Sequence, residues 1–149
     1  MNHSRLARYL AILAAAMLGL FSQFSHADAP TAMKQAMQKV VFQVSDNDPK
    51  KWDLTLNNAR NVQQELGAGQ VDIEVVVYGP GIAMLKQESP AADRIDQAEK
   101  AGIRIVACQN TMKAQKLTKE EMLGTIGYVP AGVVELMKKQ QEGYAYIRP

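Results

Sequence analysis

Short apolar runs alternate with longer amphipathic segments along this chain, and that order constrains its fold more than any other feature. The first run, residues 39–44, lacks a clean polar–apolar alternation, which is typical of a strand covered on both faces by helices. A second run, residues 71–78, is rich in valine and isoleucine and stops at Gly79-Pro80-Gly81. Further strands are predicted at residues 103–107, 126–130 and 144–147.

Helical patterns occupy the segments between these strands. They are predicted at residues 52–66, 91–101 and 132–142, with short helical segments after residues 108 and 118. The inward side chains of the last long helix are predicted to be Val133, Val134, Leu136 and Met137. Alternating strands and helices predict an α/β domain, a three-layer flavodoxin-like fold with a mostly parallel five-stranded sheet and right-handed crossovers.

Capping residues predict where some of these helices begin. Ser89-Pro90 is expected to supply a cap and a first helical position. Thr118 and Glu121 have the spacing of a capping box. Asp48-Pro49 is expected to form a turn that precedes a helix starting at Trp52.

The first 27 residues have the pattern of an export signal. Arg5 and Arg8 precede an apolar run, residues 9–21, and Ser25-His26-Ala27 is a small-x-small cleavage site. We therefore predict cleavage after Ala27, a single domain at residues 28–149 and a periplasmic location. An uncleaved membrane anchor is the alternative, although the apolar run is shorter than the roughly 20 residues that span a bilayer.

The composition after residue 27 excludes several kinds of partner and site. Without Arg5 and Arg8, 15 of the 17 basic residues remain against 15 acidic ones, so no basic surface for nucleic acid is expected. Both histidines, His3 and His26, lie in the signal, which excludes a Cys-His pair, a Ser-His-Asp triad and a His-ligated metal. Nucleic acid is therefore not expected as a partner, nor is a membrane after the signal is removed.

Metal and cofactor motifs are weak in this sequence. Asp46 and Asp48 follow the first strand, but a site like that of phospho-receiver domains would need an aspartate where Cys108 stands. Gly79-Pro80-Gly81 lacks the next glycine of a dinucleotide fingerprint and the Lys-Ser/Thr of a phosphate loop. We therefore predict neither a metal nor a cofactor.

Cys108 is the single cysteine, and it stands where the strand at 103–107 gives way to Gln109-Asn110-Thr111. Ligands of open α/β sheets gather beyond the carboxyl ends of the strands, so a thiol there would be partly exposed. Backbone N–H groups at a helix start would favour its thiolate. The alternative is a cysteine buried as a small apolar side chain. One cysteine cannot form an intramolecular disulfide, so thiol chemistry would involve another molecule.

The loops after the first three strands are expected to converge on one edge of the sheet and form a crevice. The side chains and backbone predicted to bind a ligand there belong to Gly79, Gly81, Gln109, Asn110 and Thr111. Asn58 and Asn61, three residues apart on the first helix, are further candidates that either reach this crevice or are solvated.

Five segments together resemble the DsrE/DsrF-like family. They are Asn58-Ala59-Arg60-Asn61, Val75-Val76-Val77-Tyr78-Gly79-Pro80-Gly81, Ala107-Cys108-Gln109-Asn110-Thr111-Met112, Val129-Pro130-Ala131-Gly132-Val133 and Gly143-Tyr144-Ala145-Tyr146-Ile147-Arg148-Pro149. The resemblance implies a flavodoxin-like fold that assembles as a homotrimer or hexamer, or as a related hetero-oligomer. In sulfur-trafficking members, a cysteine at the position of Cys108 carries a persulfide and passes it to a partner. The best-understood of those members work in the cytoplasm, so an export signal departs from their pattern.

Three functions are compatible with these observations. The first is a thiol-based sulfur carrier in which Cys108 accepts a persulfide sulfur and exchanges it with a donor or acceptor protein through a reactive cysteine. The second is a non-catalytic module that binds a small ligand or supports assembly, with Cys108 merely packed. The third is a redox sensor, which would need a disulfide between subunits.

Overall fold

A computed structural model describes residues 36–149, and the predicted signal lies outside them. Its sheet has five strands, all parallel, in the order β4-β3-β2-β1-β5. The strands are β1 (Gln38–Val44), β2 (Val71–Val77), β3 (Arg104–Cys108), β4 (Gly127–Val129) and β5 (Ala145–Ile147). Each predicted strand is confirmed to within one residue at either end, and the sheet is wholly rather than mostly parallel.

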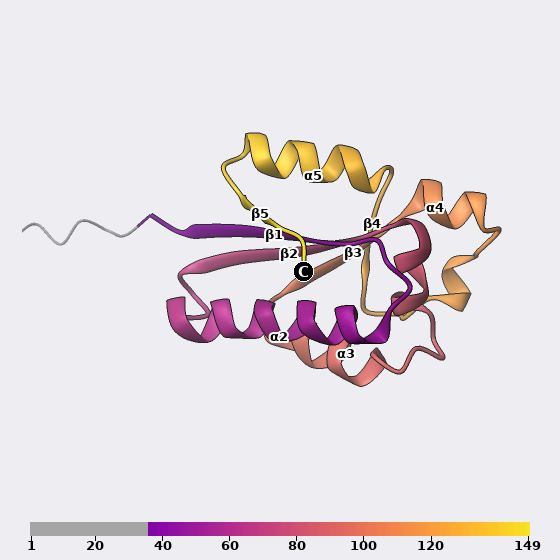
Figure 1. Ribbon diagram of the computed structural model, residues 1–149, viewed down its shortest axis with the longest axis horizontal. Coiled ribbons are helices and arrows are strands. Elements are labelled where there is room, and N and C mark those ends of the chain that lie inside the picture. Colours follow the sequence, from indigo (N-terminus) through magenta and orange to yellow (C-terminus); the bar gives the residue numbers. More distant parts are fainter. Residues whose placement is uncertain (1–35) are drawn as a thin grey trace, which may run out of the picture. The chain divides into compact units, whose positions relative to one another are not determined.

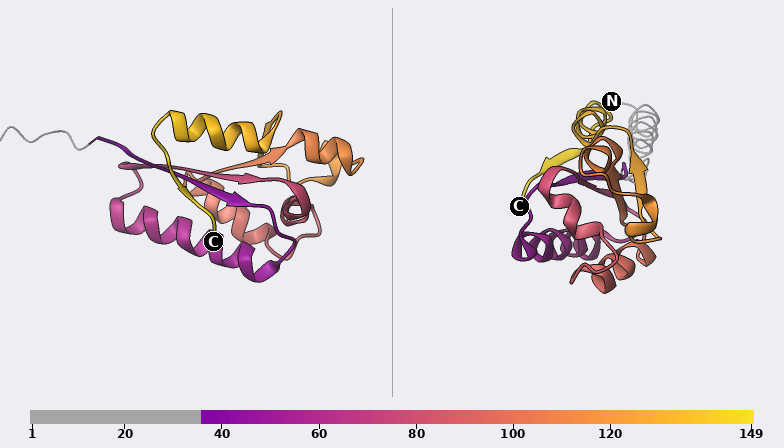
Figure 2. Two further views of the ribbon diagram at one scale, coloured as in Figure 1. Left: turned by 45° about the horizontal axis from the view of Figure 1, so that its top comes forward. Right: turned by 90° about the vertical axis from the view of Figure 1, so that its right-hand side faces the viewer.

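Helices cover both faces of this sheet, as the alternating pattern predicts (Figure 1). The helices are α2 (Pro49–Leu66), α3 (Ala92–Lys100), α4 (Gln109–Ala114) and α5 (Gly132–Gln141), with 3-10 turns η1 (Gly79–Leu85) and η2 (Lys119–Glu121). Helices α2 and α3 lie on one face, and α5 lies on the other with α4 beyond its end (Figures 1 and 2). Of the helices in the described residues, none has both the length and the apolar character needed to cross a bilayer.

The two faces of the sheet carry cores of very different size. Toward α2 and α3, side chains such as Phe42, Ile73 and Ile105 belong to a large buried cluster. Toward α5, the buried cluster is small, and Val106 and Leu136 are among its members. Because successive strand residues point to opposite faces, Cys108 lies on the same face of β3 as Val106.

The first helix begins three residues earlier than the sequence predicted. Asp48 is its N-cap, because one of its carboxylate oxygens accepts the N–H of Lys50 at 2.9 Å, and Pro49 occupies the first helical turn. The prediction that Asp48-Pro49 forms a turn before a helix at Trp52 was therefore wrong. Trp52 is a buried residue of the first turn, and its indole N–H donates to the carbonyl of Asp46 at 2.7 Å.

The other capping predictions are confirmed in part. The Ser89 hydroxyl accepts the N–H of Ala91 at 3.2 Å, but α3 itself starts only at Ala92. Thr118 and Glu121 form the predicted capping box, but the segment that follows is a single 3-10 turn rather than a helix.

Helix α5 differs most from its predicted orientation. Leu136 is buried, whereas Val133, Val134 and Met137 have 54%, 47% and 54% of their surfaces exposed, so three of the four predicted inward residues face outward. A single helix lying on a sheet contacts it along a narrow stripe, which here passes through Gly132 and Leu136, one helical turn apart. The exposed apolar surface formed by Val133, Val134 and Met137 is called the α5 apolar face below.

Candidate functional site

Cys108 is both the last residue of β3 and the N-cap of α4. Its sulfur accepts a hydrogen bond from the backbone N–H of Thr111, with 3.5 Å between nitrogen and Sγ. The side chain is buried, with only 5% of the residue surface exposed, rather than partly exposed as the strand-end position suggested. The structure thus combines the burial of a packed cysteine with a polar contact at its sulfur.

Hydrogen-bond donors around the sulfur set its acidity. Burial raises the pKa of the Cys108 thiol, but the Thr111 hydroxyl and the backbone N–H groups of Gly132, Thr111 and Asn110 act in the opposite direction. Their combined effect outweighs burial, and the pKa lies below the ordinary value for cysteine. Dipolar donors therefore favour the thiolate here, and no cation among residues 36–149 contributes to the lowered pKa.

Gly132 brings the start of α5 close to the thiol. A Cβ atom at this position would lie 3.3 Å from Cβ of Cys108 and 3.1 Å from Cβ of Tyr78. Absence of a side chain therefore allows the backbone of α5 to approach the sulfur. The sequence analysis did not select Gly132 as a site residue, although Pro130-Ala131-Gly132 before a helix was a usable signal.

Backbone contacts tie the strand-end loops together around Cys108. The N–H of Gly79 donates to the Thr111 hydroxyl at 2.9 Å, which joins the loop after β2 to α4. The N–H of Asn110 donates to the carbonyl of Pro130 at 3.1 Å, which joins α4 to the loop before α5. The structure therefore places Gly79, Asn110 and Thr111 together with Cys108.

Three of the remaining predicted site residues lie elsewhere, whereas Gln109 directly follows Cys108 in the chain. Gly81 packs against the end of β1, where an added Cβ would come within 2.9 Å of the Val44 carbonyl oxygen. Gln109 is an exposed residue in the first turn of α4. Asn58, which is partly buried, and Asn61, which is exposed, belong to α2 on the opposite face of the sheet from Cys108.

Cys108 does not line either of two pockets formed by residues 36–149. One of about 380 Å³ lies between α2 and α3, and one of about 140 Å³ lies beside the end of α2. Because only 5% of the Cys108 surface is exposed, access of a reactant to the sulfur requires movement of its neighbours.

Comparison with models of known protein families identifies a match that covers nearly the whole chain. The model of the DsrE/DsrF-like family matches residues 3–149. This chain belongs to the DsrE/DsrF-like family. A comparison with curated proteins gives no significant match.

Solved structures share the fold of this family member. A protein of unknown function, MTH1491 from Methanobacterium thermoautotrophicum, is 33% identical, with 75% of this chain and 99% of that one covered and a TM-score of 0.72. BT1422 from Bacteroides thetaiotaomicron, also of unknown function, is 14% identical over 78% of this chain and 98% of that one (TM-score 0.63). The ychN protein from E. coli is 12% identical over 76% and 100% (TM-score 0.61). At 14% and 12% identity, the last two similarities concern the fold alone.

The aspartates after β1 of this DsrE/DsrF-like protein have structural partners. Asp46 pairs with Lys51 at 3.0 Å and with Arg148 at 3.5 Å, and the hydrogen bond from Lys51 is the main cause of its lowered pKa. Asp48 caps α2. Within residues 36–149, no three His, Cys, Asp or Glu side chains converge to hold a metal ion.

The sequence analysis missed a charged cluster near the amino ends of β2 and β3, at the other ends of the strands from Cys108. Arg104 bonds to Asp72 at 2.5 Å and to Glu74 at 3.0 Å, and the Tyr144 hydroxyl donates to Asp72. Burial raises the pKa of Asp72, but the Tyr144 and Arg104 hydrogen bonds outweigh it and leave the pKa lowered. Burial dominates at Glu74 and raises its pKa. The two-residue spacing of Asp72 and Glu74 along a strand was the signal for a shared face.

Proposed function

We propose that this DsrE/DsrF-like protein is a thiol-based persulfide carrier and that Cys108 holds the transferred sulfur. The observation that carries the proposal is the setting of Sγ, which accepts the Thr111 N–H at 3.5 Å at the start of α4 and lies close to the backbone of Gly132 at the start of α5. Such N–H donors stabilise a thiolate, which is the nucleophilic form of cysteine.

The proposed transfer is a displacement at sulfur without net oxidation. The Cys108 thiolate attacks the outer sulfur of a donor persulfide, and a new sulfur–sulfur bond forms as the old one breaks. The donor leaves as a thiolate with the electron pair of the broken bond, and Cys108 becomes the persulfide. The reverse displacement by a cysteine of the acceptor protein releases the sulfur, so turnover needs a partner.

Intact-mass spectrometry tests this proposal directly. After incubation with a small-molecule persulfide, the wild type should gain the mass of one sulfur atom, and a thiol reductant should remove it. The Cys108→Ser variant should gain none. Absence of the gain in the wild type with several donors would rule out the carrier function.

The 5% exposure of Cys108 favours a second candidate, a non-catalytic ligand-binding or assembly module in which the cysteine is packed. Thiol labelling in native buffer and in denaturant separates the two candidates. Reaction only after unfolding supports the module, whereas reaction of the folded protein supports the carrier. A disulfide-linked dimer on a non-reducing gel after oxidation would instead support a redox sensor.

We also propose that the protein forms a homo-oligomer, a trimer or a hexamer. The α5 apolar face supports this, because three neighbouring apolar side chains on one helix are each about half exposed. Burial of such a face between subunits would remove apolar surface from water.

A periplasmic location with a cleaved signal remains our proposal from residues 1–27. Expression of the full chain in a Gram-negative host, followed by cell fractionation and N-terminal sequencing, tests it. We expect a periplasmic protein that begins at Asp28. Recovery of the intact chain from the membrane fraction would support an uncleaved anchor.

A further inference from the structure

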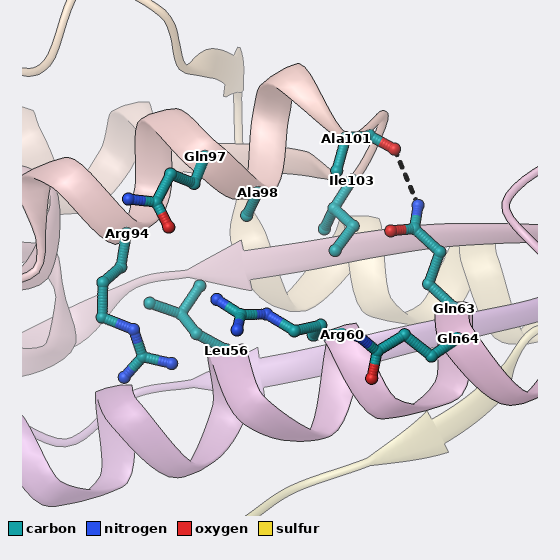
Figure 3. A pocket seen from close by; sticks show the side chains of 9 residues that line it. All are labelled: Leu56, Arg60, Gln63, Gln64, Arg94, Gln97, Ala98, Ala101 and Ile103. Carbon is teal, nitrogen blue, oxygen red and sulfur yellow. Dashed lines mark hydrogen bonds between the residues drawn. The ribbon is translucent and has the colours of Figure 1, made fainter.

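The pocket between α2 and α3 has no part in the proposed sulfur chemistry. Its lining residues come mainly from α2 and α3 (Figure 3), whereas Cys108 lies next to the start of α5 on the other face of the sheet. Its volume of about 380 Å³ is at the lower end of the range for small-molecule sites. Apolar side chains from both helices and from the residue before β3 contribute to its lining: Leu56, Ala98 and Ile103.

The charged side chains that line this pocket are all positive. Arg60 comes from α2 and Arg94 from α3, and no aspartate or glutamate lines the pocket. Arg94 is held from outside the pocket by Asp53 at 2.5 Å and by the Asn57 amide oxygen at 2.7 Å. Arg60 forms no ion pair or side-chain hydrogen bond within residues 36–149. The Asp53 carboxylate offsets one of the two charges, so about one positive charge is left without a partner.

The polar ends of several side chains point into this pocket between α2 and α3. In Figure 3 the Arg60 side chain extends along the pocket toward Leu56, and the Gln97 amide reaches down from α3 beside Arg94. At the other end, the Gln63 amide donates to the carbonyl of Ala101 at 2.7 Å and joins the two helices. The pocket therefore combines a cationic portion, with Arg60 and Arg94, and an apolar base, and at its other end the Gln63 hydrogen bond joins the two helices.

We propose that this pocket binds a small organic carboxylate with a short apolar body. A guanidinium presents paired N–H donors that match the two oxygens of a carboxylate, and Arg60 has all of its side-chain donors available. Leu56 and Ile103, which are only 3% and 2% exposed, form the buried base of the pocket, and the apolar body would lie over them. A single unmatched positive charge suits a monoanion, whereas inorganic phosphate would leave the apolar lining unused.

Nuclear magnetic resonance titration of the full chain with hexanoate tests the proposal. We expect saturable shifts of the amide signals of Arg60, Gln97 and Ile103. Hexan-1-ol has the same carbon chain without the charge, and it should bind at least tenfold more weakly, as should inorganic phosphate. Absence of saturable shifts, or equal binding of the alcohol or of phosphate, would overturn the proposal.

Variants then assign the binding to the pocket. Arg60→Gln should weaken hexanoate binding about tenfold, since a hydrogen bond to a charged group contributes roughly 1.5 kcal/mol or more. Lys50→Gln removes the same charge from the exposed start of α2, outside the pocket, and should leave binding unchanged. Cys108→Ser should also bind normally, so failure of the sulfur-carrier proposal would not affect this result. Unchanged affinity in Arg60→Gln would show that hexanoate binds elsewhere.

Discussion

At the scale of single residues, Thr111 is the side chain that most directly influences the protonation state of the Cys108 thiol. Its hydroxyl helps to lower the pKa of the thiol against the effect of burial. In Thr111→Val the pKa should rise, so the thiolate fraction at pH 7 falls. We expect the alkylation rate of the folded protein at pH 7 to fall about fivefold, as for loss of one hydrogen bond of about 1 kcal/mol.

The control for this prediction is Thr111→Ser, which keeps the hydroxyl and should retain the wild-type rate. Rates measured from pH 6 to about pH 10 should place the Thr111→Val midpoint above that of the wild type. An identical midpoint in Thr111→Val and wild type would show that the hydroxyl does not stabilise the thiolate.

Asp72 is a second single residue whose role can be tested. Its hydrogen bonds with Tyr144 and Arg104 lower its pKa, so its contribution to the free energy of unfolding depends on pH. Its pKa is lowered in the folded state, so its stabilising effect is complete above the unfolded value of about 3.9 and is lost as pH falls through the folded value. Asp72→Asn should therefore lower the free energy of unfolding at pH 7 by about 1–2 kcal/mol, with a smaller difference below pH 4.

Urea unfolding at several pH values measures this difference. Glu88→Gln is a suitable control, because Glu88 is exposed and has no hydrogen bond or ion pair within the described residues. A loss in Asp72→Asn that is the same at pH 3 and pH 7 would contradict an ionised Asp72 as its cause.

At the scale of elements, Gly81 fixes how η1 packs against the end of β1. Its N–H donates to the Ser45 carbonyl at 3.1 Å, and a Cβ would lie 2.9 Å from the Val44 carbonyl oxygen. Backbone atoms cannot move aside as a flexible side chain can, so Gly81→Ala should destabilise the fold by about 1–3 kcal/mol. Gly124→Ala, where a Cβ meets nothing within 4 Å, should change stability much less in the same urea experiment. Equal effects of the two substitutions would contradict the steric explanation.

The strands were predictable because local composition determines them, whereas the faces of α5 were not. The number of elements that cover a face of the sheet decides which helix residues are buried there. The spacing of apolar residues on one helix does not reveal that number, so the exposure of Val133, Val134 and Met137 could not be predicted. The same limit applies to Asn58 and Asn61, whose helix lies on the other face from Cys108.

Among the site residues, Thr111 and Asn110 were predictable from their position after β3. Gly132 contributes through its backbone, from a strand–helix connection remote in sequence, and its closeness to Cys108 is a product of the whole fold.

At the scale of the whole molecule, the unequal cores on the two faces of the sheet bear on assembly. One face is covered by α2 and α3 over a large buried cluster, and the other has a small cluster under α5. The α5 apolar face points away from that small cluster and is exposed in the single chain. A subunit packed there would cover the thinner side of the domain. The start of the same helix contacts Cys108, so assembly through α5 would also restrict the movements that expose the thiol.

Substitution of Met137 by glutamate tests this arrangement. Met137 is 54% exposed, so Met137→Glu should be tolerated in an isolated chain but should place an unpaired charge in a subunit interface. We expect light scattering after size-exclusion chromatography to show the mass of a trimer or hexamer for the wild type and that of a single chain for Met137→Glu. Leu54→Glu makes the same kind of change at a 46% exposed position of α2 and should leave the oligomer intact. Equal masses for wild type and Met137→Glu would place any subunit contact away from α5.

If the oligomer dissociates, faster alkylation of Cys108 in Met137→Glu would show that assembly limits access to the thiol.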